Sequence, residues 1–244
     1  GGAEPTERGA ALVESVPGLS DLAALTVRQV AQTPSYELEF GTLVDLVGAV
    51  RSAVADGADG VVVTHGTDTM AESAYVTRLT ADVDAPVVFT GAQRRPDEPS
   101  PDGPANLLTA VRAASDDRLA DLGGTYLAFD GRVHAARSVE KVHTSRLDAF
   151  ASPDAGPVAS ATHAGLRVHR EPDPPERTYE PSVPDATVRL VTSAVGVPGA
   201  PVVEAVEAGA DGVVVAATGL GNVTAGLAEE IGRASCRERV YCEV

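Results

Sequence analysis

Short apolar runs alternate with amphipathic stretches along most of this 244-residue chain. The runs that read as buried strands are 60–64, 86–90, 125–129 and 188–193. The stretches with helical spacing of apolar residues are 44–55, 69–79, 106–114 and 201–208. Parallel strands need a crossover between them, usually a helix, and strands covered on both faces are apolar throughout. The pattern therefore predicts an α/β fold built on a parallel sheet.

A proline-rich and charged stretch, 166–186, interrupts this alternation and reads as an interdomain connector. We predict a larger N-terminal domain over 1–165, with a doubly wound and mostly parallel sheet, and a smaller α/β domain over 187–230. The segment Gly-Ala-Asp-Gly-Val-Val-Val occurs at 57–63 and again at 209–215. Each copy reads as a helix end that leads into a buried strand. Two copies indicate the same βα joint in two domains rather than a solenoid.

The net charge of −16 excludes several classes of partner. Phosphate groups repel so acidic a protein, which argues against nucleic acid and against anionic membrane surfaces. No apolar run is long enough to span a bilayer. Many acidic residues, few aromatic residues and a single lysine predict a halophilic, cytoplasmic protein, because high salt screens the repulsion between its charges.

Both ends of the chain are unusual. It begins with Gly-Gly-Ala-Glu-Pro-Thr, which is neither a signal peptide nor a start at Met, so we expect sequence to be missing upstream. Residues 230–240 resemble the in-frame translation of a short-read sequencing adapter, and we predict that 231–244 are not native. Cys236 and Cys242 both lie in this tail, so the natural part is predicted to have no disulfide and no thiol nucleophile.

Lys141 is the only lysine, whereas the chain has 18 arginines. Arginine cannot replace lysine where a side chain must lose a proton, because guanidinium stays protonated. A retained lysine therefore indicates a need for an amine at this position. The simpler interpretation is that the composition drifted from lysine to arginine and one lysine survived by chance.

The segment 64–70, Thr-His-Gly-Thr-Asp-Thr-Met, places hydroxyls and a carboxylate where a predicted strand leads into a predicted helix. Amide groups at a helix start can hold a carboxylate ligand, and Asp68 can bind an ammonium group. A simpler interpretation is an ordinary helix cap, since Thr69 and Glu72 fit a capping box. A threonine such as Thr67 beside a lysine and an aspartate forms a nucleophile-activation set, in which the lysine accepts the hydroxyl proton. This chemistry suits amide hydrolysis.

Two further clusters, 90–96 and 102–107, carry polar residues in what reads as a long loop before a helix, with Asp102 near the helix cap. A third candidate cluster combines 130–132 with 141–145, and its simpler interpretation is a solvated loop. The five histidines are scattered without metal-ligand spacing and read as structural or surface residues. No Walker or dinucleotide motif occurs.

Taken in order, these segments resemble the bacterial-type L-asparaginase/glutaminase family. The similarity lies in His65 to Met70, in 88–94, in 102–107 and in Lys141 to Thr144. It implies a larger N-terminal domain and a smaller, flavodoxin-like C-terminal domain. It also implies an amidohydrolase that converts L-asparagine to L-aspartate and ammonia without metal or cofactor, in homotetramers built from tight dimers.

The resemblance also implies roles for individual residues. Thr67, Asp68 and Lys141 would form a catalytic Thr-Asp-Lys triad, and Asp68 would also bind the α-amino group of the substrate. Ser35 would hold the α-carboxylate beside Tyr36, which stands where family members often carry glutamine. Gly66 and the Ala92 backbone would line the amide pocket.

The chain departs from the family at both ends. The family signature Thr-Gly-Gly-Thr-Ile, on the opening strand, supplies the principal nucleophilic threonine and is absent here. Much of the C-terminal domain is absent as well, including an acidic residue that completes the site of the neighbouring subunit. We therefore expect this fragment to be inactive by itself, and its preference between asparagine and glutamine stays open.

Two other functions fit the same residues. One is the asparaginase-like subunit of archaeal Glu-tRNA(Gln) amidotransferase, which would pass ammonia to a partner subunit; residues 143–146 and 148–150 are similar to it. The other is a non-catalytic sensor that binds asparagine or aspartate. A sensor has no need of Lys141, and an amidotransferase subunit carries an extra N-terminal domain.

Overall fold

The computed structural model describes residues 13, 16–172 and 177–235, and the chain divides into two compact units, Gly1–Ser182 and Val183–Val244. The unusual N-terminal start and both cysteines lie outside the described residues. The division falls inside the predicted connector, 166–186. Among the described helices, none is long and apolar enough to cross a membrane.

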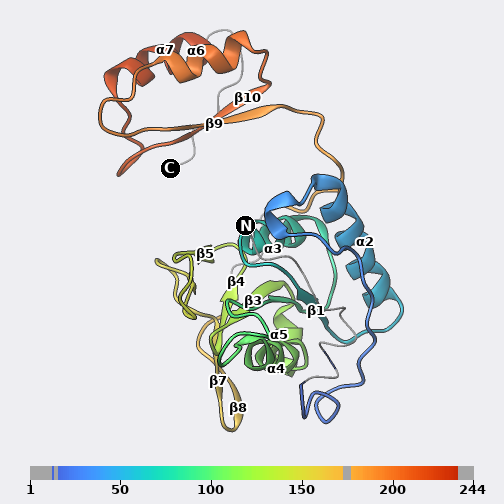
Figure 1. The fold of residues 1–244 in the computed structure, drawn as a ribbon. Coiled ribbons are helices and arrows are strands. Elements are labelled where there is room, and N and C mark those ends of the chain that lie inside the picture. The colour runs from blue at the N-terminus through green and yellow to red at the C-terminus, as the bar shows by residue number, and fades with distance from the viewer. Residues whose placement is uncertain (1–12, 14–15, 173–176, 236–244) are drawn as a thin grey trace. The chain divides into compact units, whose positions relative to one another are not determined.

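The first unit is an α/β structure, as predicted (Figure 1). Its helices are η1 (Ser35–Glu37), α2 (Phe40–Ala55), α3 (Met70–Thr80), α4 (Gly103–Ala114) and α5 (Asp117–Leu122). Its strands are β1 (Val61–Thr64), β2 (Val87–Thr90), β3 (Thr125–Phe129), β4 (Arg132–Ala135), β5 (Glu140–Lys141), β6 (Phe150–Ala151), β7 (Ala159–Thr162) and β8 (Gly165–Val168). The helices and strands expected from the strongest apolar patterns are all present, within a few residues.

The main sheet of this unit is mixed, with strand order β1-β2-β3-β4-β7-β8. The β1-β2 and β2-β3 pairs are parallel, whereas the β3-β4, β4-β7 and β7-β8 pairs are antiparallel. The prediction of a mostly parallel sheet was therefore wrong. The reason lies at 130–131, read from the sequence as a solvated loop. Asp130 and Gly131 have φ of 48° and 69°, the conformation of a two-residue hairpin turn, so the chain reverses directly into β4.

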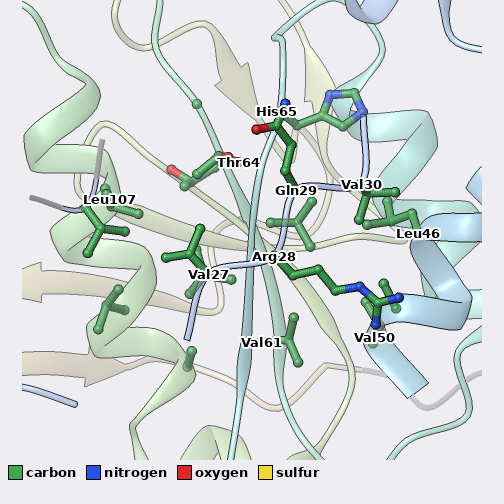
Figure 2. Close-up of a pocket in the computed structure, with 18 of the residues that line it drawn as sticks. Val27, Arg28, Gln29, Val30, Leu46, Val50, Val61, Thr64, His65 and Leu107 are labelled. Carbon is green, nitrogen blue, oxygen red and sulfur yellow. The ribbon is translucent and has the colours of Figure 1, made fainter. Parts of the chain in front are cut away.

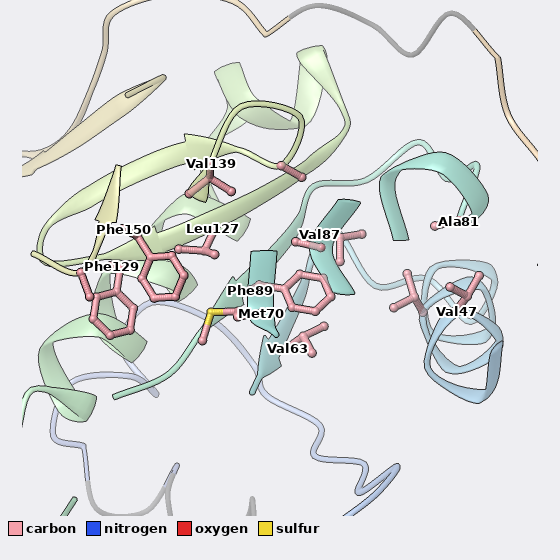
Figure 3. Packing of buried hydrophobic residues seen from close by; sticks show 14 residues of the cluster. Val47, Val63, Met70, Ala81, Val87, Phe89, Leu127, Phe129, Val139 and Phe150 are labelled. Atoms are coloured by element: carbon pink, nitrogen blue, oxygen red, sulfur yellow. The ribbon is translucent and has the colours of Figure 1, made fainter. Parts of the chain in front are cut away.

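Helices cover both faces of the parallel strands, because alternate strand residues point to opposite sides. Val63, Phe89 and Leu127 pack with residues of α2 and α3 in one buried cluster (Figure 3). Val88 and Tyr126 pack on the other face with residues of α4 and α5. The parallel strands are thus held in place from both sides, which fixes the positions of the loops at their carboxyl ends.

A small second sheet in the same unit carries Lys141. Strands β5 and β6 pair antiparallel, with Lys141 opposite Phe150. The Phe150 ring packs on Phe129 at the end of β3, with 4.9 Å between ring centroids, and both rings belong to the main core (Figure 3). The aromatic contact therefore anchors the backbone of Lys141 to the central sheet.

The second unit contains β9 (Val188–Thr192), α6 (Ala200–Glu207), β10 (Gly212–Ala216) and α7 (Ala225–Ser235). The two strands pair in parallel, and α6 and α7 pack on each other. Val191, Val213 and Val215 form a buried cluster with residues of both helices. Helix α7 includes residues 231–235 of the predicted non-native tail, and the rest of that tail lies outside the described residues.

Candidate functional site

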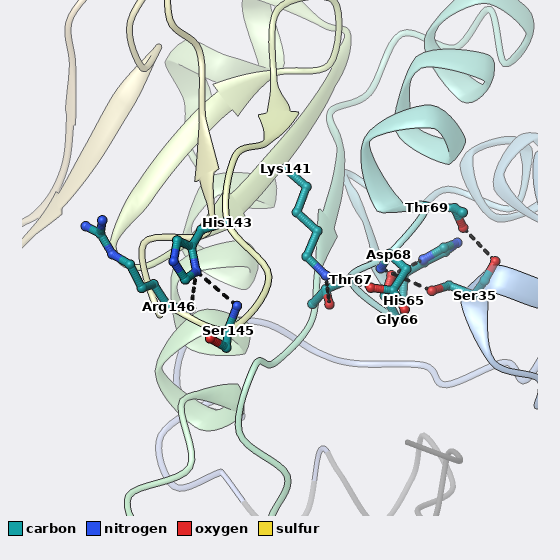
Figure 4. A network of polar contacts seen from close by, with 10 residues as sticks. All are labelled: Ser35, His65, Gly66, Thr67, Asp68, Thr69, Lys141, His143, Ser145 and Arg146. Carbon is teal, nitrogen blue, oxygen red and sulfur yellow. Dashed lines mark hydrogen bonds and ion pairs between the residues drawn. The ribbon is translucent and has the colours of Figure 1, made fainter. Parts of the chain in front are cut away.

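The candidate site lies at the carboxyl ends of β1 and β2, where open α/β sheets bind ligands. Strand β1 leads into the turn 65–69, and β2 leads into the loop 91–95. Lys141 on β5 and Ser35 on η1 approach the first of these turns (Figure 4). Four segments that are distant in sequence therefore meet at one edge of the sheet.

The Lys141 amine contacts both predicted partners. Its Nζ atom donates to Thr67 Oγ1 at 2.9 Å and to an Asp68 carboxylate oxygen at 2.6 Å (Figure 4). The Lys141 side chain is 17% exposed, whereas that of Asp68 is 55% exposed. Lys141 is thus largely enclosed with its amine on the threonine hydroxyl, while Asp68 remains open to a ligand. This arrangement can move a proton between Thr67 and Lys141.

Ser35 is buried against the turn that follows β1. Its Oγ atom accepts from the Asp68 N–H at 3.2 Å, and its carbonyl accepts from Thr69 Oγ1 at 2.7 Å. A Cβ atom on Gly66 would lie 2.7 Å from Ser35 Oγ, so only glycine permits this approach. The predicted capping box at Thr69 was therefore wrong: its side chain makes no cap bond because it ties η1 to the turn.

His65 holds the same turn from the core side. A carbonyl can only accept, so Nδ1 carries the proton and donates to the Gly66 carbonyl at 2.7 Å. The ring packs on Phe89, and its Nε2 is buried without a partner. Burial lowers the pKa of His65, opposed only in part by the Gly66 carbonyl and by Glu72. The imidazole is therefore a neutral, structural group, as predicted.

The turn after Lys141 has its own histidine. His143 Nδ1 accepts from the N–H groups of Ser145 and Arg146, each at 3.1 Å (Figure 4). Arg146 in turn pairs with Asp148. These bonds close the loop between β5 and β6, so His143 too has a structural role.

The loop after β2 is held by an acidic side chain that the sequence suggested only as a helix cap. Asp102 stands at the cap position of α4 but makes no cap bond. Its carboxylate instead accepts from the N–H groups of Gln93 and Arg94, at 2.8 to 3.1 Å. Asn106, one helical turn later, donates to the Gly91 carbonyl at 2.9 Å. Sequence reasoning marked 102–107 as polar but did not connect it to the site.

All the predicted site residues line one open cleft of about 1860 Å³: Ser35, Tyr36, Gly66, Thr67, Asp68, Ala92 and Lys141. Tyr36 is half exposed beside Ser35. The cleft continues as an apolar trough along β1, beneath the segment 27–30 (Figure 2). Among the described residues, no group of three or more His, Cys, Asp or Glu side chains is placed to hold a metal ion. The cleft thus joins a polar, lysine-containing end to an apolar trough.

A family model described as "Asparaginase, N-terminal" matches residues 1–174. A "Probable L-asparaginase" from Deinococcus radiodurans is 38% identical over 194 residues, which cover 78% of this chain and 57% of that protein. A glutamyl-tRNA(Gln) amidotransferase subunit from Halobacterium salinarum is 36% identical over 241 residues, or 91% of this chain and 55% of that protein. The chain thus spans little more than half the length of these two relatives.

A comparison with a solved structure shows that the fold, too, is similar to that of an L-asparaginase. The crystal structure of a "Probable Cytoplasmic L-asparaginase" from Campylobacter jejuni superposes with a TM-score of 0.88 at 29% sequence identity. The superposition covers 96% of this chain and 76% of that one. The likeness therefore extends over nearly all of the chain.

Proposed function

The chain belongs to the asparaginase family, and on that premise we propose that it carries the N-terminal machinery of an amidohydrolase that converts L-asparagine to L-aspartate and ammonia. The contact of the Lys141 amine with both Thr67 and Asp68 is the observation that carries the proposal. An enclosed amine in hydrogen-bond contact with a threonine hydroxyl is placed for proton transfer.

In the proposed reaction, a threonine oxygen attacks the amide carbon and its proton passes to Lys141 Nζ. The tetrahedral intermediate collapses when the amide nitrogen takes this proton from Lys141 and leaves as ammonia. Water then hydrolyses the resulting ester, which releases L-aspartate and restores the hydroxyl. Thr67, Asp68 and Lys141 form the triad, and the resemblance implies a second threonine from an opening strand that precedes this segment in the family.

Substrate recognition is assigned to the rest of the cleft. Asp68, the more exposed partner of Lys141, binds the α-amino group. Ser35 binds the α-carboxylate, and Tyr36 lies beside it at the mouth of the cleft. The amide group faces Gly66 and the backbone of Ala92. We further propose that the whole protein acts in the cytoplasm as a homo-oligomer, without metal or cofactor, and that it is adapted to high salt.

A second candidate function is that of an amidotransferase subunit. The Halobacterium salinarum amidotransferase subunit is 36% identical to this chain in an alignment that covers 91% of it, and this similarity supports the second function. The same triad would then release ammonia from an amide for use by a partner protein. Both functions would use the same chemistry at Lys141, but only the amidotransferase subunit would depend on a partner protein for ammonia release.

The test is ammonia release from L-asparagine, in molar KCl, by the complete gene product that contains these residues. Lys141→Met should reduce the rate at least about 1000-fold, because no group remains to accept the threonine proton. Lys141→Arg keeps the positive charge but cannot lose it, and should be equally inactive. The 244-residue chain alone is expected to be inactive.

Three results would redirect the proposal. Undiminished turnover in Lys141→Met would remove the triad from the mechanism. Ammonia release only when a partner subunit and Glu-tRNA(Gln) are added would establish the amidotransferase function. Saturable binding of asparagine without ammonia release, by the complete protein, would indicate a sensor.

A further inference from the structure

The N–H and C=O groups of Ala92 have no hydrogen-bond partner among the described residues, although Ala92 is half-buried in the wall of the cleft. Backbone polar groups pair with protein, water or ligand, so groups without a protein partner in the wall of a cleft are available to a ligand. A primary carboxamide presents an acceptor and two donors, so it complements a neighbouring C=O and N–H. The backbone of Ala92 is therefore suited to recognise an amide if its orientation is fixed.

Two side chains fix the two peptide units that contain Ala92. Asn106 Nδ2 donates to the Gly91 carbonyl at 2.9 Å, and this peptide unit ends in the Ala92 N–H. The Asp102 carboxylate accepts from the Gln93 N–H at 3.0 Å, in the unit that begins with the Ala92 carbonyl. In a trans peptide the C=O and N–H point in opposite directions, and no described peptide is cis. Both polar groups of Ala92 therefore point away from Asp102 and Asn106.

The two side chains are themselves held in place. Asn106 Nδ2 also donates to Asp102 Oδ2 at 3.0 Å, and Asn106 Oδ1 accepts from the Asp130 N–H at 2.9 Å. Asp130 belongs to the tight turn between β3 and β4, and Asn106 is only 2% exposed. Neither Asp102 nor Asn106 is among the residues that line the cleft. One buried amide thus joins the loop after β2, helix α4 and the β3-β4 turn.

We propose that Asp102 and Asn106 are positioning residues that orient the Ala92 backbone and thereby set the preference of the cleft for a carboxamide. This inference rests on the proposed amidohydrolase function, because only then does the cleft receive an amide. The Ala92 carbonyl accepts from the NH₂ of an amide but repels a carboxylate oxygen. The same orientation therefore favours binding of the amide substrate and release of the acid product.

The kinetic test compares Asn106→Ala with the unmodified complete gene product. We expect kcat/KM for L-asparagine to fall about 100-fold, because misplacing a recognition group by about 1 Å has an effect of this size. The inhibition constant of L-aspartate should not rise, and should fall if anything, since the acid loses only a repulsion when the Ala92 carbonyl is misplaced. Asp102→Asn keeps one acceptor oxygen for the loop, so its loss should be smaller, about tenfold.

Thr109→Ala is the matched control. Thr109 lies on the same helix, is 6% exposed, and its hydroxyl donates only to the Ala105 carbonyl within that helix. We expect this variant to lower the Tm without changing kcat/KM at temperatures where it is folded. An equal kinetic loss in Thr109→Ala, or a loss below twofold in folded Asn106→Ala, would overturn the positioning role.

A second readout does not depend on activity. The ¹⁵N order parameters of residues 91–94 should fall from about 0.85 to below about 0.6 in Asn106→Ala and stay unchanged in Thr109→Ala. If the unmodified protein releases no ammonia, the proposed function fails while this measurement still reports on the orientation of Ala92. If the loop stays rigid in Asn106→Ala, the inference fails even where the function stands.

Discussion

The segment Gly-Ala-Asp-Gly-Val-Val-Val occurs once in each unit, and its two copies form the same local structure. In the first copy, Ala58 N–H donates to the Ala53 carbonyl at 3.0 Å; in the second, Ala210 N–H donates to the Ala205 carbonyl at 3.0 Å. Gly57 and Gly209 both have positive φ, 98° and 75°. Each copy is thus a Schellman-type helix end that feeds a parallel strand.

The two copies lead into different turns. After the first, the chain enters the turn 65–69, whose groups bind Ser35 and Lys141 from distant segments. After the second, Thr218 and Asn222 exchange both backbone hydrogen bonds, so that turn is closed on itself. The local sequence therefore determines the helix-to-strand joint, whereas a site requires groups brought from elsewhere.

The largest expected contrast concerns the second glycine of each copy. A Cβ atom on Gly60 would lie 2.2 Å from the Ala114 carbonyl oxygen, whereas the nearest atom to a Cβ on Gly212 is 3.7 Å away. Gly60→Ala should therefore lower the stability of the first unit by about 3 kcal/mol. Gly212→Ala should raise that of the second unit by about 0.5 kcal/mol. Hydrogen exchange by mass spectrometry, resolved by unit, measures both; equal effects would contradict the packing described for Gly60.

The next contrast is in how the stability of each unit depends on pH. All five histidines lie in the first unit, and burial lowers the pKa of His134 to about 4. The unfolded chain then takes up protons more readily than the folded unit between pH 6.5 and 4. Stability is therefore lost as pH falls through this window, by about 3 kcal/mol for His134. His65 adds to the loss in the same direction.

The check is unit-resolved hydrogen exchange at pH values from 7 to about 4.5, after correction for the pH dependence of intrinsic exchange. The second unit should change little above pH 5, since it contains no histidine. His134→Gln should flatten the profile of the first unit. An unaltered profile in that variant would assign the loss to other groups.

A smaller and equal effect is expected at the first glycine of each copy. Gly57 and Gly209 are both left-handed, and neither would bring a Cβ atom within 4 Å of another residue. Alanine at either position should cost about 1 kcal/mol, from backbone strain alone. Costs that differ by more than about 0.5 kcal/mol would show that the two helix ends are not equivalent.

The smallest contrast concerns the aspartate. Both aspartates are exposed, but Asp211 accepts from the Thr187 N–H at 2.8 Å, whereas Asp59 has no hydrogen bond among the described residues. Asp211→Ala should cost about 1 kcal/mol, and Asp59→Ala should stay within about 0.5 kcal/mol. Urea titrations followed by the same unit-resolved exchange provide the measurement. A larger loss at Asp59 would reveal a contact that this structure does not contain.

The sequence predicted those parts of the fold that local pattern determines. The strands at 61–64 and 87–90, and the helices that follow them, show clear apolar runs and spacing. The strands from 132 to 168 are short and weakly patterned, so their antiparallel pairing depended on the turn at 130–131 and could not be anticipated. The capping box predicted at Thr69 was wrong because the Thr69 hydroxyl donates to the Ser35 carbonyl, 34 residues away in sequence.

The candidate site was predictable where residue type itself is unusual. Lys141 is conspicuous as the only lysine, and its amine contacts Thr67 and Asp68, the two residues that the family resemblance grouped with it. Asp102 and Asn106 were not connected to the site, because an aspartate before a helix normally reads as a cap. Only the fold shows that their partners belong to the loop of Ala92.

The single lysine has a practical consequence. Among side chains, a reagent that acylates amines has one target in this chain, Lys141 Nζ, which lies in the cleft. Mass spectrometry after labelling therefore measures how accessible Lys141 Nζ is to the reagent, without any engineered probe. A small molecule seated on Asp68 would shield that atom, so protection from labelling would rank ligands directly, independent of turnover.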